Sequence, residues 1–298
     1  MLGASSGFGR GAAAELAAQG ANVVVSARRG DVLDELVAAI EADGGRAIAV
    51  PADISDAGQV AAILEAAVGA FGHVDVWINN VGIGALGFFW DVPMEDHARV
   101  VEVNLTGFVY GSHVALRHFR ERGEGILLNV GSVDSKVPLA LQSTYAATKA
   151  AVLSLGRSLN EELRICGQAE RITVGTIMPW AVDTPWWSHA ANYTGHAPRM
   201  AAMDDPQLVV DAIVAACTEP KAEQPVGWKA HGARISHALM PDLTARMSGD
   251  VAYAEMRKGA PAPITRGTIH TPGPQGTSVA GGVRERMRRE DAGLPADG

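Results

Sequence analysis

The chain has 298 residues, of which 47% are hydrophobic and 19% charged, and it carries a net charge of −8 at pH 7. This composition is typical of a globular protein and excludes a wholly disordered or collagen-like chain. An acidic balance without a long run of Lys or Arg argues against nucleic acid, or an anionic membrane, as the main partner.

Short β-branched runs alternate with helical stretches from residue 1 to about residue 226. Strands that are almost entirely apolar and separated by helices are typical of a parallel sheet with helices on both faces. We therefore predict a doubly wound, mostly parallel, Rossmann-like α/β fold. Strands are expected at 23–25, 47–50, 74–78, 126–130, 172–177 and 226–228, and helices at 12–19, 32–40, 60–71, 98–119, 145–165, 208–217 and 237–247.

One domain is predicted at residues 1–256, followed by a tail at residues 257–298. The tail is rich in Gly and Pro and shows no apolar period before the charged segment 283–290. Such a composition is typical of an extended or disordered segment. Wrapping around a partner subunit is the alternative role for this tail.

Three glycines at positions 3, 7 and 9 lie just before the first predicted helix. Glycines at this spacing let backbone N–H groups and a helix N-terminus approach a pyrophosphate. A flexible turn is the alternative, but the position before a helix and a βαβ unit favours a dinucleotide site. The predicted phosphate loop comprises Gly3, Ser5, Ser6, Gly7, Phe8 and Gly9.

Only Met1 and Leu2 precede this loop, where a doubly wound sheet places its central strand. Because a strand needs about five residues, the first strand is expected to be truncated, which would leave a gap and unpaired backbone groups. Two explanations are open. Either the working protein is a few residues longer, which we favour, or the short form is real and is unstable or filled from elsewhere.

The next predicted strand ends at Arg28 and Arg29, and the first acidic residue after them is Asp31. An acidic residue at this edge would bind the ribose 2′-hydroxyl of NAD(H), whereas Arg accommodates the 2′-phosphate of NADP(H). We therefore predict NADP(H), with a solvated basic helix start as the alternative. Asp53 and Ile54 follow the third strand, where they would contact the adenine or cap the next helix.

Tyr145 and Lys149 stand four residues apart in a long predicted helix. Residues at this spacing lie on one helix face, about 6 Å apart along the axis. A nearby ammonium would stabilise the tyrosinate and lower a pKa that is otherwise about 10. Ser132 follows the strand 126–130, at the sheet edge where ligands bind, and can hold a carbonyl oxygen. A turn or cap is the alternative role for this serine.

The sequence resembles the short-chain dehydrogenase/reductase family over residues 3 to about 226. Each motif alone is weak, but their joint order is highly specific. The motifs are Gly3-x-x-x-Gly7-x-Gly9, Asn79-Asn80-Val81-Gly82, Asn104 within 103–107, Ser132 and Tyr145-x-x-x-Lys149.

The resemblance implies a role for each motif. Tyr145 would be the proton donor or acceptor, and Lys149 would lower its pKa and bind the nicotinamide ribose. Ser132 would orient the substrate, and Asn104 would anchor a water in the proton relay. Asn79 would stabilise the central sheet. The further cofactor-binding residues implied are Asn80, Val81, Gly82, Pro179, Val182 and Thr184.

The sequence departs from the family pattern at Leu2, Val81 and Trp180. Trp180 is expected to alter the turn beside the nicotinamide or to crowd the pocket. Aromatic and His residues gather in two predicted loops, at 88–90 and 186–196. They indicate a pocket for a bulky apolar ketone or alcohol, with packing against the rest of the protein or a subunit as the alternative.

The predicted function is hydride transfer between NADP(H) and a ketone/alcohol pair. A non-catalytic NADP-binding regulator or interaction protein, and an epimerase or dehydratase, are the rival hypotheses. The family resemblance also implies a homodimer or homotetramer acting on a small molecule.

Two cysteines, Cys166 and Cys217, are too few for a disulfide framework or a four-cysteine zinc site. We therefore expect a reducing, cytoplasmic setting and no bound metal. No apolar run approaches the ~18 residues of a membrane-spanning helix. A basic-then-apolar signal segment is not apparent either.

Overall fold

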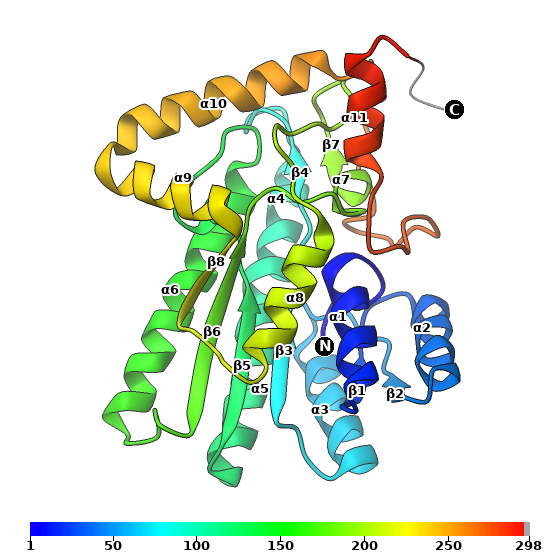
Figure 1. Ribbon diagram of the computed structural model, residues 1–298, viewed down its shortest axis with the longest axis vertical. Coiled ribbons are helices and arrows are strands. Elements are labelled where there is room, and N and C mark those ends of the chain that lie inside the picture. The colour runs from blue at the N-terminus through cyan, green and yellow to red at the C-terminus, as the bar shows by residue number, and fades with distance from the viewer. Residues whose placement is uncertain (295–298) are drawn as a thin grey trace.

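Four parallel strands form the centre of the molecule in the order β3-β5-β6-β8 (Figure 1). All three pairings are parallel, and the Rossmann-like α/β prediction is confirmed. The computed structural model describes residues 1–294, and the last four residues of the predicted tail lie outside them. The strands are β3 (Val76–Asn79), β5 (Gly125–Val130), β6 (Ile172–Pro179) and β8 (Glu223–Val226).

A second parallel pair lies beside this sheet and is joined to it by Leu2. The Leu2 N–H donates to the carbonyl of Ile78 at 3.0 Å, and Leu2 forms a parallel bridge with Ser26 on the other side. The Met1 carbonyl accepts from the Ser26 N–H at 3.0 Å. The expected gap is therefore filled by two residues whose backbone groups pair on both sides. The pair consists of β1 (Asn22–Val25) and β2 (Arg46–Ala49).

Helices cover both faces of the sheet. On one face α3, α5 and α6 enclose a core that contains Trp77, Phe108 and Phe119. On the other face α1 and α8 pack over Ile78 and Leu128, while α1 and α2 cover β1. Each fully buried large apolar side chain contributes about 1.5–3 kcal/mol. The helices are α1 (Gly7–Ala18), α2 (Gly30–Ala42), α3 (Ala57–Phe71), α5 (Gly107–Arg122), α6 (Ser143–Ile165) and α8 (Pro206–Ala216).

Buried amides connect β3 to β5. The Asn79 Nδ2 atom donates to Asn129 Oδ1 at 2.9 Å, and the Trp77 indole donates to Asn79 Oδ1 at 2.8 Å. Both asparagines are fully buried. A one-residue slip would move these amides to opposite faces and leave polar groups unpaired, at about 1–3 kcal/mol each. The amides therefore fix the strand register that places the ends of β3 and β5.

Beyond β8 the chain forms two helices and then a long irregular segment. Helices α9 (Gly227–Leu239) and α10 (Pro241–Lys258) meet at Met240, because Pro241 lacks the N–H that would continue α9. The predicted strand at 226–228 is wrong in position, since Gly227 (φ +76°) already begins α9.

Residues 264–282, which we call the strap, lie between α7 (Trp186–His189) and α1 (Figure 1). Ile269 in the strap is fully buried, and helix α11 (Val283–Asp291) follows. The predicted boundary at residue 257 therefore falls in the last turn of α10, and the segment after it packs on the domain.

Short elements complete the edge of the molecule above the sheet. The two-residue strands β4 (Ala85–Leu86) and β7 (Ala191–Asn192) pair in parallel. Among the described residues, no helix is both long and apolar enough to cross a membrane. The remaining elements are α4 (Met94–Val101), the π-helical turn η1 (Glu102–Thr106), the 3₁₀ turn η2 (Val133–Ser135) and α7 (Trp186–His189).

Candidate active site

A cavity of about 530 Å³ lies where the carboxyl ends of the strands meet the loops that follow them. It brings together every predicted site residue except Gly9 and Asn104. The predicted residues that line it are Gly3, Ser5, Ser6, Gly7, Phe8, Arg28, Arg29, Asp53, Ile54, Asn80, Val81, Gly82, Ser132, Tyr145, Lys149, Pro179, Val182 and Thr184.

The phosphate loop turns into α1 through two glycines in the left-handed region, Gly3 (φ +75°) and Gly7 (φ +57°). Asn80 Nδ2 holds the loop by donating to the Gly3 carbonyl at 3.1 Å. Gly9 packs against this carbonyl, and a Cβ there would stand only 2.1 Å from its oxygen. Gly9 thus brings α1 close to the loop instead of lining the cavity. A helix N-terminus at a cavity fits a pyrophosphate.

Two arginines line the cavity just after β1. Arg29 donates to Ser5 Oγ at 3.1 Å and to the Ser5 carbonyl at 3.2 Å, so its guanidinium is held against the phosphate loop. Arg28 lies beside it. Two adjacent guanidinium groups at this edge fit a phosphate on the adenosine ribose.

Asp53 lines the same end of the cavity, but its carboxylate is already engaged. It accepts from Arg99 and from the Ser55 hydroxyl, the latter at 2.8 Å. Burial raises the Asp53 pKa, but the bonds from Ser55 and Arg99 outweigh burial and hold the pKa below its usual value. Asp53 is therefore an ionised, hydrogen-bonded side chain. Ile54 is buried beside it.

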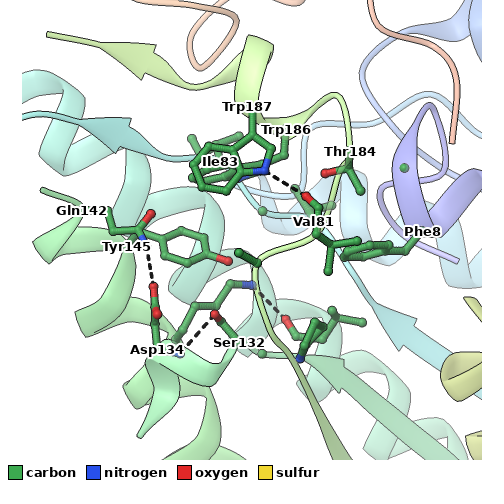
Figure 2. A pocket seen from close by; sticks show the side chains of 18 of the residues that line it. Phe8, Val81, Ile83, Ser132, Asp134, Gln142, Tyr145, Thr184, Trp186 and Trp187 are labelled. Carbon is green, nitrogen blue, oxygen red and sulfur yellow. Dashed lines mark hydrogen bonds between the residues drawn. The ribbon is translucent and has the colours of Figure 1, made fainter. Parts of the chain in front are cut away.

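Ser132 and Tyr145 are brought together by the end of β5 and the first turn of α6. Figure 2 shows Ser132, Asp134 and Gln142 beside the Tyr145 ring, with Trp186 and Trp187 on its other side. Ser132 Oγ accepts from the Asp134 N–H at 3.1 Å. Because this bond uses a lone pair, the hydroxyl hydrogen can be donated to Tyr145 Oη or, when substrate is bound, to a substrate oxygen.

The pKa of Tyr145 corrects one expectation. Burial raises this pKa well above its usual value, the nearby Asp134 charge raises it further, and a hydrogen bond with Ser132 opposes both effects. The predicted lowering by Lys149 is not found, because desolvation of the phenolate dominates. Tyr145 is consequently protonated at neutral pH, the form that can donate a proton to a ketone oxygen.

Lys149 lies one helical turn from Tyr145 and is almost completely buried. Its Nζ donates to the carbonyl of Val130 at 2.8 Å and stands 5.6 Å from the centre of the Tyr145 ring. Burial lowers the Lys149 pKa to about 7, although the Asp134 charge works in the opposite direction. The predicted pairing of Tyr145 and Lys149 on one helix face is present.

Asp134 is a buried cavity residue that sequence reasoning missed. Its Oδ2 accepts from Gln142 Nε2 at 2.8 Å. Burial raises its pKa to about 7, and Lys149 acts to lower it. The sequence does place Asp134 two residues after Ser132, in the loop after a strand, where functional residues are common. Only the fold shows that this loop buries the carboxyl group.

Asn104 lies in the π-helical turn η1 and does not line the cavity. Its Oδ1 accepts from the Ile83 N–H at 2.9 Å, and its Nδ2 donates to the Ile83 carbonyl at 2.8 Å. Nδ2 also lies 3.3 Å from Thr148 Oγ1 in α6. The structure thus places Asn104 as a clamp between the loop after β3 and the helix that carries Tyr145.

The segment after β6 forms the opposite wall. The Trp187 indole donates to the Val182 carbonyl at 2.9 Å, and the Trp186 ring stands 5.2 Å from the Tyr145 ring. Trp180 lines the cavity as expected, and the buried indole nitrogens of Trp180 and Trp186 have no hydrogen-bond partner among the described residues.

The aromatic loops divide between the cavity and the surface. Trp186, Trp187 and His189 line the cavity, whereas Tyr193 instead donates to Asp96. His196 lies outside the cavity lining, and its Nδ1 is 2.9 Å from the Gly259 carbonyl oxygen. In the first loop, Phe88, Phe89 and Trp90 are exposed at the surface.

Several cavity residues come from segments that carry no functional motif. Met247 and Val251 in α10, Ser236 in α9, and Thr268 and Pro272 in the strap line the cavity. These segments lie far from the motifs in the chain, so only the tertiary structure brings them there. Within residues 1–294, no group of three or more His, Cys, Asp or Glu could hold a metal ion.

Comparison with known proteins identifies the family. Residues 1–193 match the sequence model described as short chain dehydrogenase. The chain belongs to this family. The uncharacterized oxidoreductase YxnA of Bacillus subtilis is 35% identical over 265 residues, covering 88% of this chain and 74% of the relative. The 3beta-hydroxysteroid dehydrogenase 1 of Eggerthella lenta is 39% identical over 187 residues, covering 62% and 70%.

The solved structures agree with the sequence relatives. A short-chain dehydrogenase/reductase from Burkholderia phymatum in complex with NAD aligns with a TM-score of 0.71 at 25% identity, covering 84% of this chain and 94% of that chain. The short-chain dehydrogenase described here is therefore an NAD(P)-dependent oxidoreductase that acts on CH–OH groups or the corresponding carbonyls.

Proposed function

We propose that this short-chain dehydrogenase interconverts a ketone and an alcohol with NADP(H). The observation that carries the proposal is that Ser132 and Tyr145 lie together in the cavity that the phosphate loop also lines (Figure 2). A dinucleotide with its pyrophosphate at the start of α1 would extend along this cavity toward the pair. The bound nicotinamide supplies or accepts the hydride.

The chain's own residues supply alignment and proton transfer. Ser132 donates its hydroxyl hydrogen to the carbonyl oxygen, which polarises the carbon. Tyr145, protonated at neutral pH, donates its proton to the same oxygen during reduction. Lys149, fixed by the Val130 carbonyl, places a cationic or donor group behind the tyrosine. In oxidation the same proton moves back to Tyr145.

The proposed preference for NADP(H) rests on the adenosine end of the cavity. Arg28 and Arg29 line it, and at Arg29 a 2′-phosphate can replace the neutral backbone carbonyls that the planar guanidinium now binds. Asp53, the acidic side chain nearest to them in the cavity wall, is engaged by Arg99 and Ser55. It is therefore not a free acceptor for a ribose 2′-hydroxyl.

The proposed substrate is a small-molecule ketone or alcohol with a bulky apolar body. Trp186, Trp187, Met200, Met247 and Val251 give the cavity a largely apolar wall, and the Trp186 ring faces Tyr145. The relative named as a 3beta-hydroxysteroid dehydrogenase fits this class. Within this proposal the protein acts in the cytoplasm as a homodimer or homotetramer.

Replacing Tyr145 with Phe tests the proposal. The ring is kept and the proton lost, so turnover with NADPH and a panel of bulky ketones is expected to fall at least a hundredfold. NADPH binding, measured by fluorescence titration, should be retained, since the remaining cavity wall is unchanged. Undiminished ketone reduction by the variant would contradict the proposal, and so would a wild-type protein that binds NADPH but reduces no ketone.

A further inference from the structure

The strap covers the adenosine end of the cavity. Thr268, Pro272 and Gly273 belong to the strap and line the cavity beside Arg28 and Arg29. They are more than 230 residues away from the arginines in the chain. The inference below concerns how the strap and the cofactor share these two arginines, and it rests on the proposed dinucleotide site.

The Arg28 guanidinium is occupied by backbone carbonyls of the strap. Its Nη1 donates to His270 at 2.8 Å and to Ile269 at 3.2 Å, and its Nη2 donates to Thr268 at 2.7 Å. Both terminal nitrogens of the guanidinium are thus directed at the strap. These are the nitrogens with which an arginine grips a phosphate.

The Arg29 guanidinium is engaged in the same way by the next residues of the strap. Its Nη1 donates to the carbonyls of Gln275 at 2.8 Å and Gly273 at 3.3 Å, and its Nη2 donates to that of Gly276 at 3.3 Å. The other bonds of this guanidinium go to Ser5 in the phosphate loop. A phosphate could reach either arginine only by taking over donors that the strap now holds.

The strap also contacts the loop that would bind the pyrophosphate. The Gly7 N–H, at the start of α1, donates to the Ser278 carbonyl at 3.0 Å. His189 Nε2 lies 3.0 Å from the Gln275 carbonyl oxygen. Carbonyl oxygens of the strap therefore contact the arginines after β1, the start of α1 and the last residue of α7.

Both ends of the strap are anchored away from the arginines. At one end, Arg266 and His270 bind the fully buried Asp96, at 3.0 and 2.8 Å. At the other end, Asp183 accepts from the Val283 N–H at 2.8 Å and caps α11. Residues 271–282 can therefore lift from Arg29 while the anchors hold the ends in place, and the bonds from Arg28 to residues 268–270 belong to the anchored end.

We infer that the strap is an internal competitor of the cofactor's 2′-phosphate, so that binding of NADP(H) lifts residues 271–282 of the strap from Arg29. A phosphate bears a full negative charge, and its bonds to guanidinium are stronger than those of neutral carbonyls. NAD(H) has no such group, so it competes with the strap only through its pyrophosphate at the Gly7 N–H and leaves the bonds of Arg29 to the strap. Displacing the strap costs free energy, and this cost reduces the affinity that the 2′-phosphate adds to NADP(H) binding.

The first test measures affinities by calorimetry with NADP⁺, 2′,5′-ADP, NAD⁺ and ADP. In Gly276→Ala, the new Cβ would stand 2.4 Å from His189 Nε2 in a left-handed residue (φ +71°), so the seated strap is disfavoured. By linkage, the two 2′-phosphate ligands should tighten at least threefold more than NAD⁺ and ADP, which compete with the strap only at the Gly7 N–H. Gly293→Ala is the matched control, since Gly293 has φ +69° and no atom near its Cβ position.

A gentler variant guards against misfolding of the first. Pro274→Gly adds freedom to the released strap and should tighten NADP⁺ binding about two- to fivefold. NADP⁺ affinity that is unchanged or weaker in both variants, while the control behaves as the parent protein, would overturn the inference and leave the proposed function intact.

A second readout follows the strap itself in the full chain. Val279 packs partly buried against α1 and α8, and Val279→Cys, combined with Cys166→Ser and Cys217→Ser, reports strap lifting through its rate of thiol labelling. NADP⁺ and 2′,5′-ADP should raise the rate at least fivefold more than NAD⁺ and ADP do. Saturation with NADP⁺ without faster labelling refutes the inference alone. No binding of any of the four ligands would refute the proposed function together with it.

Discussion

Replacing Gly9 with Ala should weaken both the fold and dinucleotide binding. The added Cβ would stand 2.1 Å from the Gly3 carbonyl oxygen and 2.6 Å from Asn80 Nδ2. Since Cβ atoms essentially never come within 3.0 Å of such atoms, the phosphate loop must retreat by about 0.9 Å. The Gly3 carbonyl and Asn80 Nδ2 are hydrogen-bonded to each other, so neither can move away without the other or without breaking this bond.

The size of the effect follows from this clash. Overpacking of a tightly packed site costs about 1–3 kcal/mol of unfolding free energy. For a chain of this size, that corresponds to a drop of roughly 2–10 °C in melting temperature. A displacement close to 1 Å also misaligns the donors at the start of α1, so we expect NADP⁺ to bind at least tenfold more weakly.

Calorimetric melting and NADP⁺ titration of the purified variant measure both quantities. Gly69→Ala is the matched control, because Gly69 lies in α3 with nothing within 4 Å of its Cβ position. Alanine there should stabilise the protein by about 0.5–1 kcal/mol. A Gly9→Ala protein with the parent's melting temperature and affinity would refute the packing argument.

Two further predictions concern buried charges. Asp134→Asn removes a charge that raises the pKa of Tyr145, so the alkaline fall in ketone-reduction turnover should move to lower pH; a pH–rate profile that is unshifted or shifted upward would contradict this. Arg199→Leu removes a buried guanidinium that binds Glu290 at 2.6 Å and should cost about 3–5 kcal/mol in urea unfolding. The double variant with Glu290→Gln should lose less than the sum of the losses of the two single variants, and additive losses would show that the pair is uncoupled.

The order of strands and helices could be predicted because apolar periodicity is a local property of the chain. The same holds for Ser132, Tyr145 and Lys149: a strand end and one helical turn are enough to bring their side chains together. The end of β8 was missed because one left-handed residue, Gly227, starts a helix where the β-branched pattern favours a strand.

The remaining features depend on burial and on contacts between distant segments. Whether the Tyr145 pKa rises or falls depends on how much water the fold removes, and the sequence alone does not state this. Asp134 looks like an ordinary loop residue until the cavity closes around it. Likewise, Arg28 and Arg29 were predicted to meet a phosphate, and the partners they meet in the structure are carbonyls from the other end of the chain.

The amide pair of Asn79 and Asn129 bears on how this sheet could be re-engineered. The two side chains form a hydrogen bond between neighbouring strands. If either strand is replaced by that of a homologue, the new strand must therefore carry an asparagine at the matching position. A chimaera carrying only one of them would bury an amide without a hydrogen-bond partner. Its strands could then pair in a shifted register. Recombination libraries should therefore cut outside residues 76–129, keeping both strands in one inherited block.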